Sequence, residues 1–267
     1  LGEHPAPARL ILPVAQQPAV LAFTDAGRVA LLRWEFAGQQ PGPLETFLPE
    51  GMKGERVVQL LVMPQDPAGA SVGLLSSDGR FKRLPIEEFQ ELSGRATSVL
   101  KLKEGVTLKR AVLCREGQDL VVASSTGRLL RLAVNEANLP VMGRNAQGPV
   151  LLRLLPGETV VGAVGLTEGG SVVMASRQGL IQRLPLDNLR RCQRGDIGQI
   201  GVRFEQRGDQ LVDLCNGSQP LLGVLLADGR SLRLDLAAIT TEDGTGTDQE
   251  LKLGSKDQLQ ELVPLLL

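Results

Sequence analysis

The arginines of this sequence recur in a pattern that could bind phosphate. Five predicted turns end in glycine, and in four of them an arginine follows the glycine directly. In three of the copies a second arginine comes three residues later. A guanidinium offers planar, bidentate donors that match phosphate oxygens, so one basic cluster per copy predicts a track of phosphate contacts. The copies are Gly27-Arg28, Gly79-Arg80, Gly127-Arg128, Gly179-Leu180 and Gly229-Arg230.

Two interpretations of these basic residues stay open at this point. They can contact phosphate, or they can bridge neighbouring repeats and cover apolar surface with their stems. Other basic residues lie in the loops between the copies and are included in the same expectation. The candidate phosphate contacts are Arg28, Arg80, Lys82, Arg83, Arg95, Arg128, Arg131, Arg144, Arg177, Arg183, Arg190, Arg191, Arg194, Arg230 and Arg233.

The sequence lacks the residues that most catalytic, metal-binding and ATP-binding sites require. The sequence has no tyrosine and a single histidine, His4, so the groups most used for acid–base catalysis and metal ligation are missing. Gly69 to Gly73 matches a nucleophile elbow around Ser71, but the elbow needs a histidine partner. No phosphate-binding loop for ATP is present. We therefore assign no catalytic residue and expect no metal and no cofactor.

The cysteines indicate a reducing compartment. There are three of them, with no Cys-x-x-Cys pair, so neither a disulfide framework nor a zinc site is predicted. We expect Cys114, Cys192 and Cys215 to be buried or half-buried thiols in a cytoplasmic protein. Apolar residues make up 42% of the chain, and no apolar run approaches the roughly 20 residues of a membrane helix, so no membrane contact is expected.

Charge is unevenly distributed along the chain, although its formal net value is only −1. Residues 235–267 contain seven acids and two bases, whereas residues 144–203 contain eight arginines and four acids. Any basic surface should therefore be strongest in the third and fourth repeats. The acidic segment Thr240 to Glu250 is expected to be a solvated loop, with a role as a competitor for the basic surface as the alternative.

The elements that carry the arginines are predicted to be β-strands. The glycines recur at intervals of 52, 48, 52 and 50 residues, which indicates an internal repeat. In the second copy, Val57 to Met63, Val72 to Leu75, Phe81 to Leu84 and Ser98 to Leu102 are apolar or alternating, and Ser77 to Arg80 predicts a two-residue hairpin turn. No sustained 3.6-residue period occurs, so helices should be few and short.

The repeat predicts an all-β fold. A four-stranded sheet cannot bury both of its faces alone, so we expect a propeller-like disc of about five, or six, four-stranded blades stacked on one another. We expect residues 1–267 to form a single domain with repeats near 8–54, 55–106, 107–157, 158–208 and 209–267.

The repeated motif resembles a known family. Gly-Arg-x-x-Arg-Leu, with variations, stands at residues 79–84, 127–132, 179–184 and 229–234, and Met142 to Gly148 adds a glycine-rich loop. This pattern is similar to the C-terminal domain of the A subunit of bacterial type IIA topoisomerases, namely DNA gyrase and topoisomerase IV. The resemblance implies a β-pinwheel whose blades exchange strands and whose basic rim binds and bends double-stranded DNA. The candidate phosphate contacts then become candidate DNA contacts.

The resemblance also implies partners and leaves alternatives. The partners would be the catalytic core of the same A subunit, together with the ATPase B subunit, in the bacterial cytoplasm at the nucleoid. The domain itself would be non-catalytic, because these enzymes cleave DNA with a tyrosine. The gyrase-specific box is approached only at Gln193 to Gly198, and its expected place precedes Leu1, so the two enzymes are not distinguished. We interpret the chain as a piece of a longer protein; a protein-interaction propeller that has lost DNA wrapping is the alternative.

Overall fold

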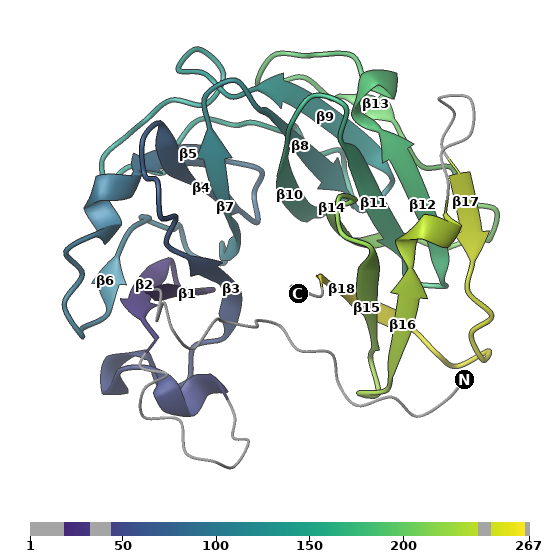
Figure 1. Ribbon diagram of the computed structural model, residues 1–267, viewed down its shortest axis with the longest axis horizontal. Helices are drawn as coiled ribbons and strands as arrows, with labels where there is room; N and C mark the ends of the chain where they lie inside the picture. Colours follow the sequence, from purple (N-terminus) through teal and green to yellow (C-terminus); the bar gives the residue numbers. More distant parts are fainter. Residues whose placement is uncertain (1–18, 33–43, 240–246, 265–267) are drawn as a thin grey trace. The chain divides into compact units, whose positions relative to one another are not determined.

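The structure is a computed structural model that describes residues 19–32, 44–239 and 247–264. These residues form five antiparallel sheets and several 3-10 helices, with no α-helix among them (Figure 1). The all-β prediction is therefore confirmed. Contacts divide the chain into two compact units: the first holds residues 19–32, 44–116 and 134–151, and the second holds 117–133, 152–239 and 247–264. The expected single domain stays a prediction.

The first unit contains two sheets. One has the strand order β3-β1-β2-β6 and the other the order β5-β4-β7. The strands are β1 (Val20–Thr24), β2 (Arg28–Leu31), β3 (Val57–Val62), β4 (Ala70–Ser76), β5 (Phe81–Pro85), β6 (Thr97–Ser98) and β7 (Leu108–Arg115). The 3-10 helices are η2 (Leu44–Phe47), η3 (Glu50–Met52) and η4 (Ile86–Phe89).

The second unit contains three sheets, with the orders β10-β8-β9-β13, β14-β11-β12-β17 and β16-β15-β18. Its strands are β8 (Asp119–Ser124), β9 (Arg128–Ala133), β10 (Val160–Leu166), β11 (Ser171–Ser176), β12 (Leu180–Pro185), β13 (Gln199–Ile200), β14 (Leu211–Asn216), β15 (Leu221–Leu226), β16 (Ser231–Asp235), β17 (Thr247–Glu250) and β18 (Leu259–Pro264). Its 3-10 helices are η5 (Leu186–Asn188) and η6 (Leu236–Ala238).

Each sheet is built from more than one sequence repeat. A hairpin pairs on one side with the first strand of the next repeat, as β1 does with β3. On its other side the hairpin receives a short strand or bridge from about 70 residues further along the chain. These pairs are Arg28 with Ser98, Arg80 with Val150, Arg128 with Ile200 and Leu180 with Glu250.

This exchange corrects the strand expected at Ser98 to Leu102. Only Thr97 and Ser98 pair with β2. Val99 and Leu100 leave the ladder and are buried in the core of the first unit. These apolar residues belong to a buried loop that follows the exchanged strand. The spacing of apolar residues does not distinguish such a loop from a buried strand.

The hairpin turns use three residues, and the two-residue prediction is wrong. Ser76 donates its backbone N–H to the carbonyl of Arg80, and Gly79 donates to the carbonyl of Ser76. Gly79 has φ of 82°, and the glycines of the other four hairpins are also left-handed. A turn closed by a left-handed residue is the common three-residue hairpin, and glycine adopts that conformation without strain. The predicted need for glycine is therefore confirmed.

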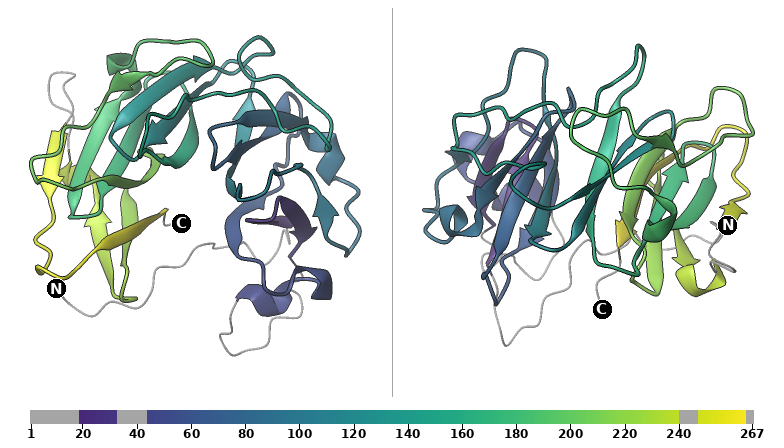
Figure 2. Two further views of the ribbon diagram at one scale, coloured as in Figure 1. Left: turned by 180° about the vertical axis from the view of Figure 1, so that it is seen from behind. Right: turned by 90° about the horizontal axis from the view of Figure 1, so that it is seen from above.

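The core lies between neighbouring sheets within each unit. In the second unit every residue of β11 is buried. Val172 and Met174 pack with one cluster, and Val173 and Ala175 pack with another that includes Val224. A strand covered on both faces reads as a continuous apolar run, which explains why β11 shows no alternation. Figure 2 shows the same strands in two further views.

Some sequence predictions differ from the structure or concern residues outside the described ranges. His4 and residues 240–246 are outside them. Thr247–Glu250, expected to belong to a solvated loop, forms strand β17 and pairs with β12. The acidic composition of this segment hid its strand, because β17 lies at the edge of its sheet and edge strands tolerate charge.

Two glycines lie where exchanged segments approach their hairpins most closely. Gly148 and Gly198 have positive φ, and a Cβ built on either would clash with a backbone carbonyl, that of Phe81 or of Leu129. We expect Gly198→Ala to lower the free energy of unfolding by about 2–3 kcal/mol, from left-handed strain and the clash together. Urea unfolding measures this. Gly195→Ala is the matched control, since Gly195 also has positive φ but open space around it; equal losses for both variants would contradict the close approach.

Candidate nucleic-acid interface

The arginine at the start of β9 belongs to a buried ion pair. Arg128 Nε donates to Glu158 Oε1 at 2.8 Å, and its terminal nitrogens bond to Glu158 Oε2 and to the carbonyls of Arg153 and Ile197. Ser124 and the backbone of Leu155 also donate to the Glu158 carboxylate. Hydrogen bonds from Arg128 hold the pKa of Glu158 at about 2, against a usual 4.5. The pair therefore stays charged at neutral pH and fixes two loops to the hairpin.

The other arginines that follow a turn glycine are also paired within the protein. Arg28 Nε lies 2.7 Å from Glu55, and Arg80 lies 3.5 Å from Asp78 and donates to the carbonyl of Gly148 at 2.9 Å. Arg230 pairs with Asp228 and Asp257. These side chains are partly exposed, so their pairs are weaker than the Arg128 pair. Phosphate would have to displace a carboxylate at each of them.

In three of the four motif copies the second arginine clamps one repeat to another. Arg131 Nε donates to Asp119 at 2.5 Å, and its Nη1 donates to the carbonyls of Leu186 and Leu189 in the next repeat. Arg183 does the same with Ser171 and the carbonyls of Leu236 and Ile239. In both cases the guanidinium bonds to backbone carbonyls at the two ends of a 3-10 helix, η5 or η6.

Arg83 is the clamp of the first unit and its side chain is buried. Its Nε donates to the carbonyl of Leu139 at 2.5 Å, and its terminal nitrogens pair with Glu116 and Glu136. The expectation that Arg83, Arg128, Arg131 and Arg183 contact phosphate therefore does not fit the structure, because their donors are already bonded to the protein. Arg83, Arg131 and Arg183 each stand two residues after a buried apolar residue of the same strand, so their side chains point to the same, inner face.

Lys82 is also misassigned as a phosphate contact. It is fully buried, and its Nζ donates to the carbonyls of Gly143 at 2.8 Å and Arg144 at 3.0 Å. Burial lowers the pKa of Lys82 to about 8. It therefore holds the loop at 143–148 and cannot reach solvent.

This lysine gives the protein a measurable pH dependence. Because the folded-state pKa lies below the unfolded value of 10.5, the unfolded chain binds more protons between about pH 8 and 10.5. The free energy of unfolding should therefore rise with pH across this window, by about 2–3 kcal/mol from this group. Urea unfolding of the protein and of Lys82→Leu, the residue at the equivalent position 130, checks this: the variant should lack the rise, and identical pH profiles would contradict it.

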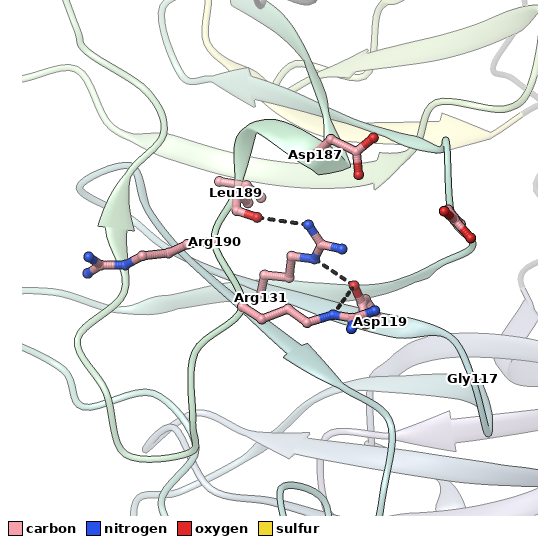
Figure 3. Close-up of a pocket in the computed structure, with 8 residues that line it drawn as sticks. Gly117, Asp119, Arg131, Asp187, Leu189 and Arg190 are labelled. Atoms are coloured by element: carbon pink, nitrogen blue, oxygen red, sulfur yellow. Dashed lines mark hydrogen bonds and ion pairs between the residues drawn. The ribbon is translucent and has the colours of Figure 1, made fainter.

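A polar cleft of about 560 Å³ lies beside the Arg131 clamp in the second unit. Asp119 is buried there and accepts from Arg131 and from Arg191, the latter at 3.2 Å. Figure 3 shows Arg131 between Asp119 and the carbonyl of Leu189, whereas Arg190 points away from them. Of the three arginines that line the cleft, Arg131 is bonded to the protein, Arg191 is paired with Asp119, and Arg190 is exposed.

A minority of the candidates are exposed without a partner in the described part of the chain. We define the crossover segments as residues 86–96, 134–149 and 186–198, which run from the second strand of one hairpin to the exchanged strand. Arg95, Arg190 and Arg194 lie exposed on them with no side-chain hydrogen bond or ion pair among the described residues, as does Arg233 on β16. Arg144, paired with Glu88 at 2.8 Å, and Arg191 lie on them too. Arg177 is half-buried at a hairpin turn.

Sequence reasoning passed over one exposed arginine near this set. Arg153 is exposed, and its backbone N–H approaches the carbonyl of Asp196 at 3.5 Å, which places it beside the crossover segment that carries Arg194. Arg153 follows no turn glycine, so the repeated motif did not mark it as a candidate. The high arginine content of residues 144–203 was the only sequence feature that pointed to it.

The three cysteines are free thiols. Cys114 and Cys215 are buried and Cys192 is half-buried, as expected, and none is in a disulfide. Burial raises the pKa of the Cys114 thiol to about 12, so it is inert at neutral pH. In the described ranges, no cluster of three or more His, Cys, Asp or Glu is placed to hold a metal ion. Nor does any helix in them have the length and apolar character to span a membrane.

Sheets joined by exchanged strands, with exposed arginines on the crossover segments, define an all-β repeat domain. The sequence model of the family described as "DNA gyrase C-terminal domain, beta-propeller" matches residues 74–115, 118–164 and 170–214. The chain belongs to this DNA gyrase C-terminal domain family. The resemblance inferred from the repeated motif is therefore confirmed.

Individual proteins similar to this chain are A subunits of the same two topoisomerases. The A subunit of DNA topoisomerase 4 of Synechocystis is 32% identical over 155 residues, which cover 55% of this chain and 17% of that protein. The A subunit of DNA gyrase of Pseudomonas aeruginosa is 27% identical over 197 residues, covering 73% and 21%. The chain thus spans about a fifth of the length of these curated relatives.

Solved structures show the same fold. A DNA gyrase A C-terminal domain superposes with a TM-score of 0.78 at 14% identity, covering 100% of this chain and 92% of that one. The C-terminal domain of a DNA topoisomerase IV superposes with a TM-score of 0.76 at 14% identity, covering 92% and 78%.

Proposed function

We propose that this chain binds duplex DNA without cutting it and bends or wraps the duplex for a type IIA topoisomerase. The catalytic core of the same A subunit, together with an ATPase B subunit, would be its partners, in the bacterial cytoplasm at the nucleoid. Membership of the gyrase C-terminal domain family and the names of its relatives support this. The absence of tyrosine from the sequence supports a non-catalytic role.

The observation that carries the proposal is the placement of unpaired arginines on crossover segments. Arg95, Arg190 and Arg194 are exposed there, while the motif arginines other than Arg233 are bonded within the protein. Guanidinium groups held on short anchored loops bind phosphates of the DNA backbone without reading sequence. Aromatic residues form only 3% of the chain, so stacking with single strands is not favoured.

Binding to short and long linear duplexes at two salt concentrations tests this function. We expect salt-sensitive binding that favours the longer duplex, because each neutralised phosphate releases counterions and a bend must be offset by many contacts. A nicked circle resealed by ligase in the presence of the protein should change its linking number. No binding at low salt would refute the proposal.

A protein-interaction role is the second candidate. It is favoured by the ion-paired motif arginines and by exposed apolar side chains at Val141, Leu155 and Ile197. The same DNA-binding experiment separates the two, since an interaction module has no reason to prefer a long duplex.

A further inference from the structure

Two exchanged strand segments present an exposed β-branched residue at the same register position. Val150 pairs with Arg80 in the first unit, and Ile200 pairs with Arg128 in the second. Val150 is 37% exposed and Ile200 is 57% exposed. Each lies two residues after a positive-φ glycine, Gly148 or Gly198, that seats the segment against the hairpin. The exposure therefore follows from how the exchange is built.

Local hydrogen bonds fix the direction of Ile200. The side chain of Gln199 accepts from the backbone N–H of Arg190 at 3.0 Å and donates to the carbonyl of Asn188. Because neighbouring residues of a strand point to opposite faces, Ile200 points away from that loop. Its exposure is set by the strand.

Two other exposed apolar residues of the second unit lie beside the ion pair between Arg128 and Glu158. Ile197, 41% exposed, accepts from Arg128 through its carbonyl, and Leu155, 44% exposed, donates its N–H to Glu158. We call Leu155, Ile197 and Ile200 the exchange-edge patch. The exposed arginines Arg153 and Arg194 adjoin it, because Arg153 accepts from Arg128 through its carbonyl and Arg194 lies in the turn before Ile197.

We infer that the exchange-edge patch is an apolar DNA-contacting surface that packs on deoxyribose rings of the duplex, an inference that rests on the proposed function. The arginines beside the patch favour a polyanionic occupant. A DNA strand alternates anionic phosphates with sugars whose C–H faces are apolar, so it matches a surface on which apolar side chains stand next to arginines. Burying Ile200 against sugar contributes affinity that does not depend on counterion release.

The salt dependence of DNA binding tests this surface. The variant Ile200→Ser should bind a long duplex about five- to tenfold more weakly at every salt concentration, with an unchanged slope of log affinity against log salt. Arg194→Gln should instead lower that slope by about 0.9. Ile200→Val is the matched control, because valine stands at the equivalent position 150, and it should stay close to the unmodified protein.

The outcomes separate this inference from the proposed function. If the unmodified protein binds DNA and Ile200→Ser binds equally well, or changes the slope as an arginine variant does, the apolar surface is refuted and DNA binding stands. If the unmodified protein does not bind DNA, the proposed function fails and this inference fails with it. Leu155→Ser repeats the test at a second residue of the exchange-edge patch, so the result does not depend on one variant's stability.

Discussion

Replacing Glu158 with glutamine should lower the free energy of unfolding by about 3–5 kcal/mol at pH 7. The substitution leaves the Arg128 guanidinium buried without a counter-charge, and the carbonyls of Arg153 and Ile197 that it bonds do not neutralise it. An uncompensated buried charge costs this much in other proteins. Urea unfolding measures the loss directly.

The pH dependence of unfolding provides a second test of the ion pair between Arg128 and Glu158. The pKa of Glu158 is about 2 in the folded state and 4.5 in the unfolded reference, so its contribution is present above pH 4.5 and is lost as the pH falls toward 2. Glu158→Gln should lack that part of the pH dependence, which amounts to about 2 kcal/mol.

Glu55→Gln is the control for this prediction. Glu55 makes the corresponding contact with Arg28, whose side chain is 32% exposed. Solvent can compensate the charge there, so the loss should be about 1 kcal/mol or less. If the two variants lose equal stability, burial does not distinguish the two pairs and the structural role assigned to Arg128 is wrong.

Replacing Arg190, Arg191 and Arg194 together with glutamine should weaken duplex binding about 100- to 1,000-fold at low salt. All three lie on one crossover segment, and their side chains are exposed. Removing three phosphate contacts should lower the slope of log affinity against log salt by about 2.7. Titration of a long duplex at several salt concentrations gives both quantities. Stability should change little, since only Arg191 has an ion pair, to Asp119.

A charge-matched variant controls for net charge. Arg56, Lys103 and Lys256 are exposed but lie outside the crossover segments, and their replacement by glutamine removes the same charge. We expect a loss of affinity below tenfold, because screening weakens charges that do not touch the DNA. Equal losses for the two triple variants would mean that net charge, and not the crossover segments, drives binding.

The sequence predicted the repeat well because the repeat is carried by local chemistry. Gly127 must be left-handed to close its hairpin, and apolar runs on either side mark the two strands. Both signals act over a few residues, so they can be read without knowing the partners. The fold class and the turn positions follow from them.

The roles of the arginines could not be read in the same way. Arg131 and Arg233 stand at the same position of the motif, yet one bonds to carbonyls 55 and 58 residues away and the other is exposed with no side-chain bond among the described residues. A guanidinium can donate to a carbonyl, a carboxylate or a phosphate. Which one it meets is decided by burial, and burial is a property of the folded sheets.

The exchanged strands were hidden for a related reason. Thr97 and Ser98 pair with β2, about 70 residues earlier, across an intervening hairpin. A two-residue strand has no readable periodicity, so its own sequence does not reveal its partner. The resemblance to the gyrase domain implied exchange, whereas the strand pattern alone did not.

Arginine-specific chemical modification, followed by mass spectrometry, tests most directly whether motif arginines hold the fold while crossover arginines meet DNA. Without DNA, Arg95, Arg190 and Arg194 should react, whereas Arg83, Arg128 and Arg131 should not. A saturating long duplex at low salt should then protect Arg190 and Arg194. If these two stay reactive on DNA, or if Arg83 and Arg131 react freely in its absence and become protected by it, the division of roles drawn here is contradicted.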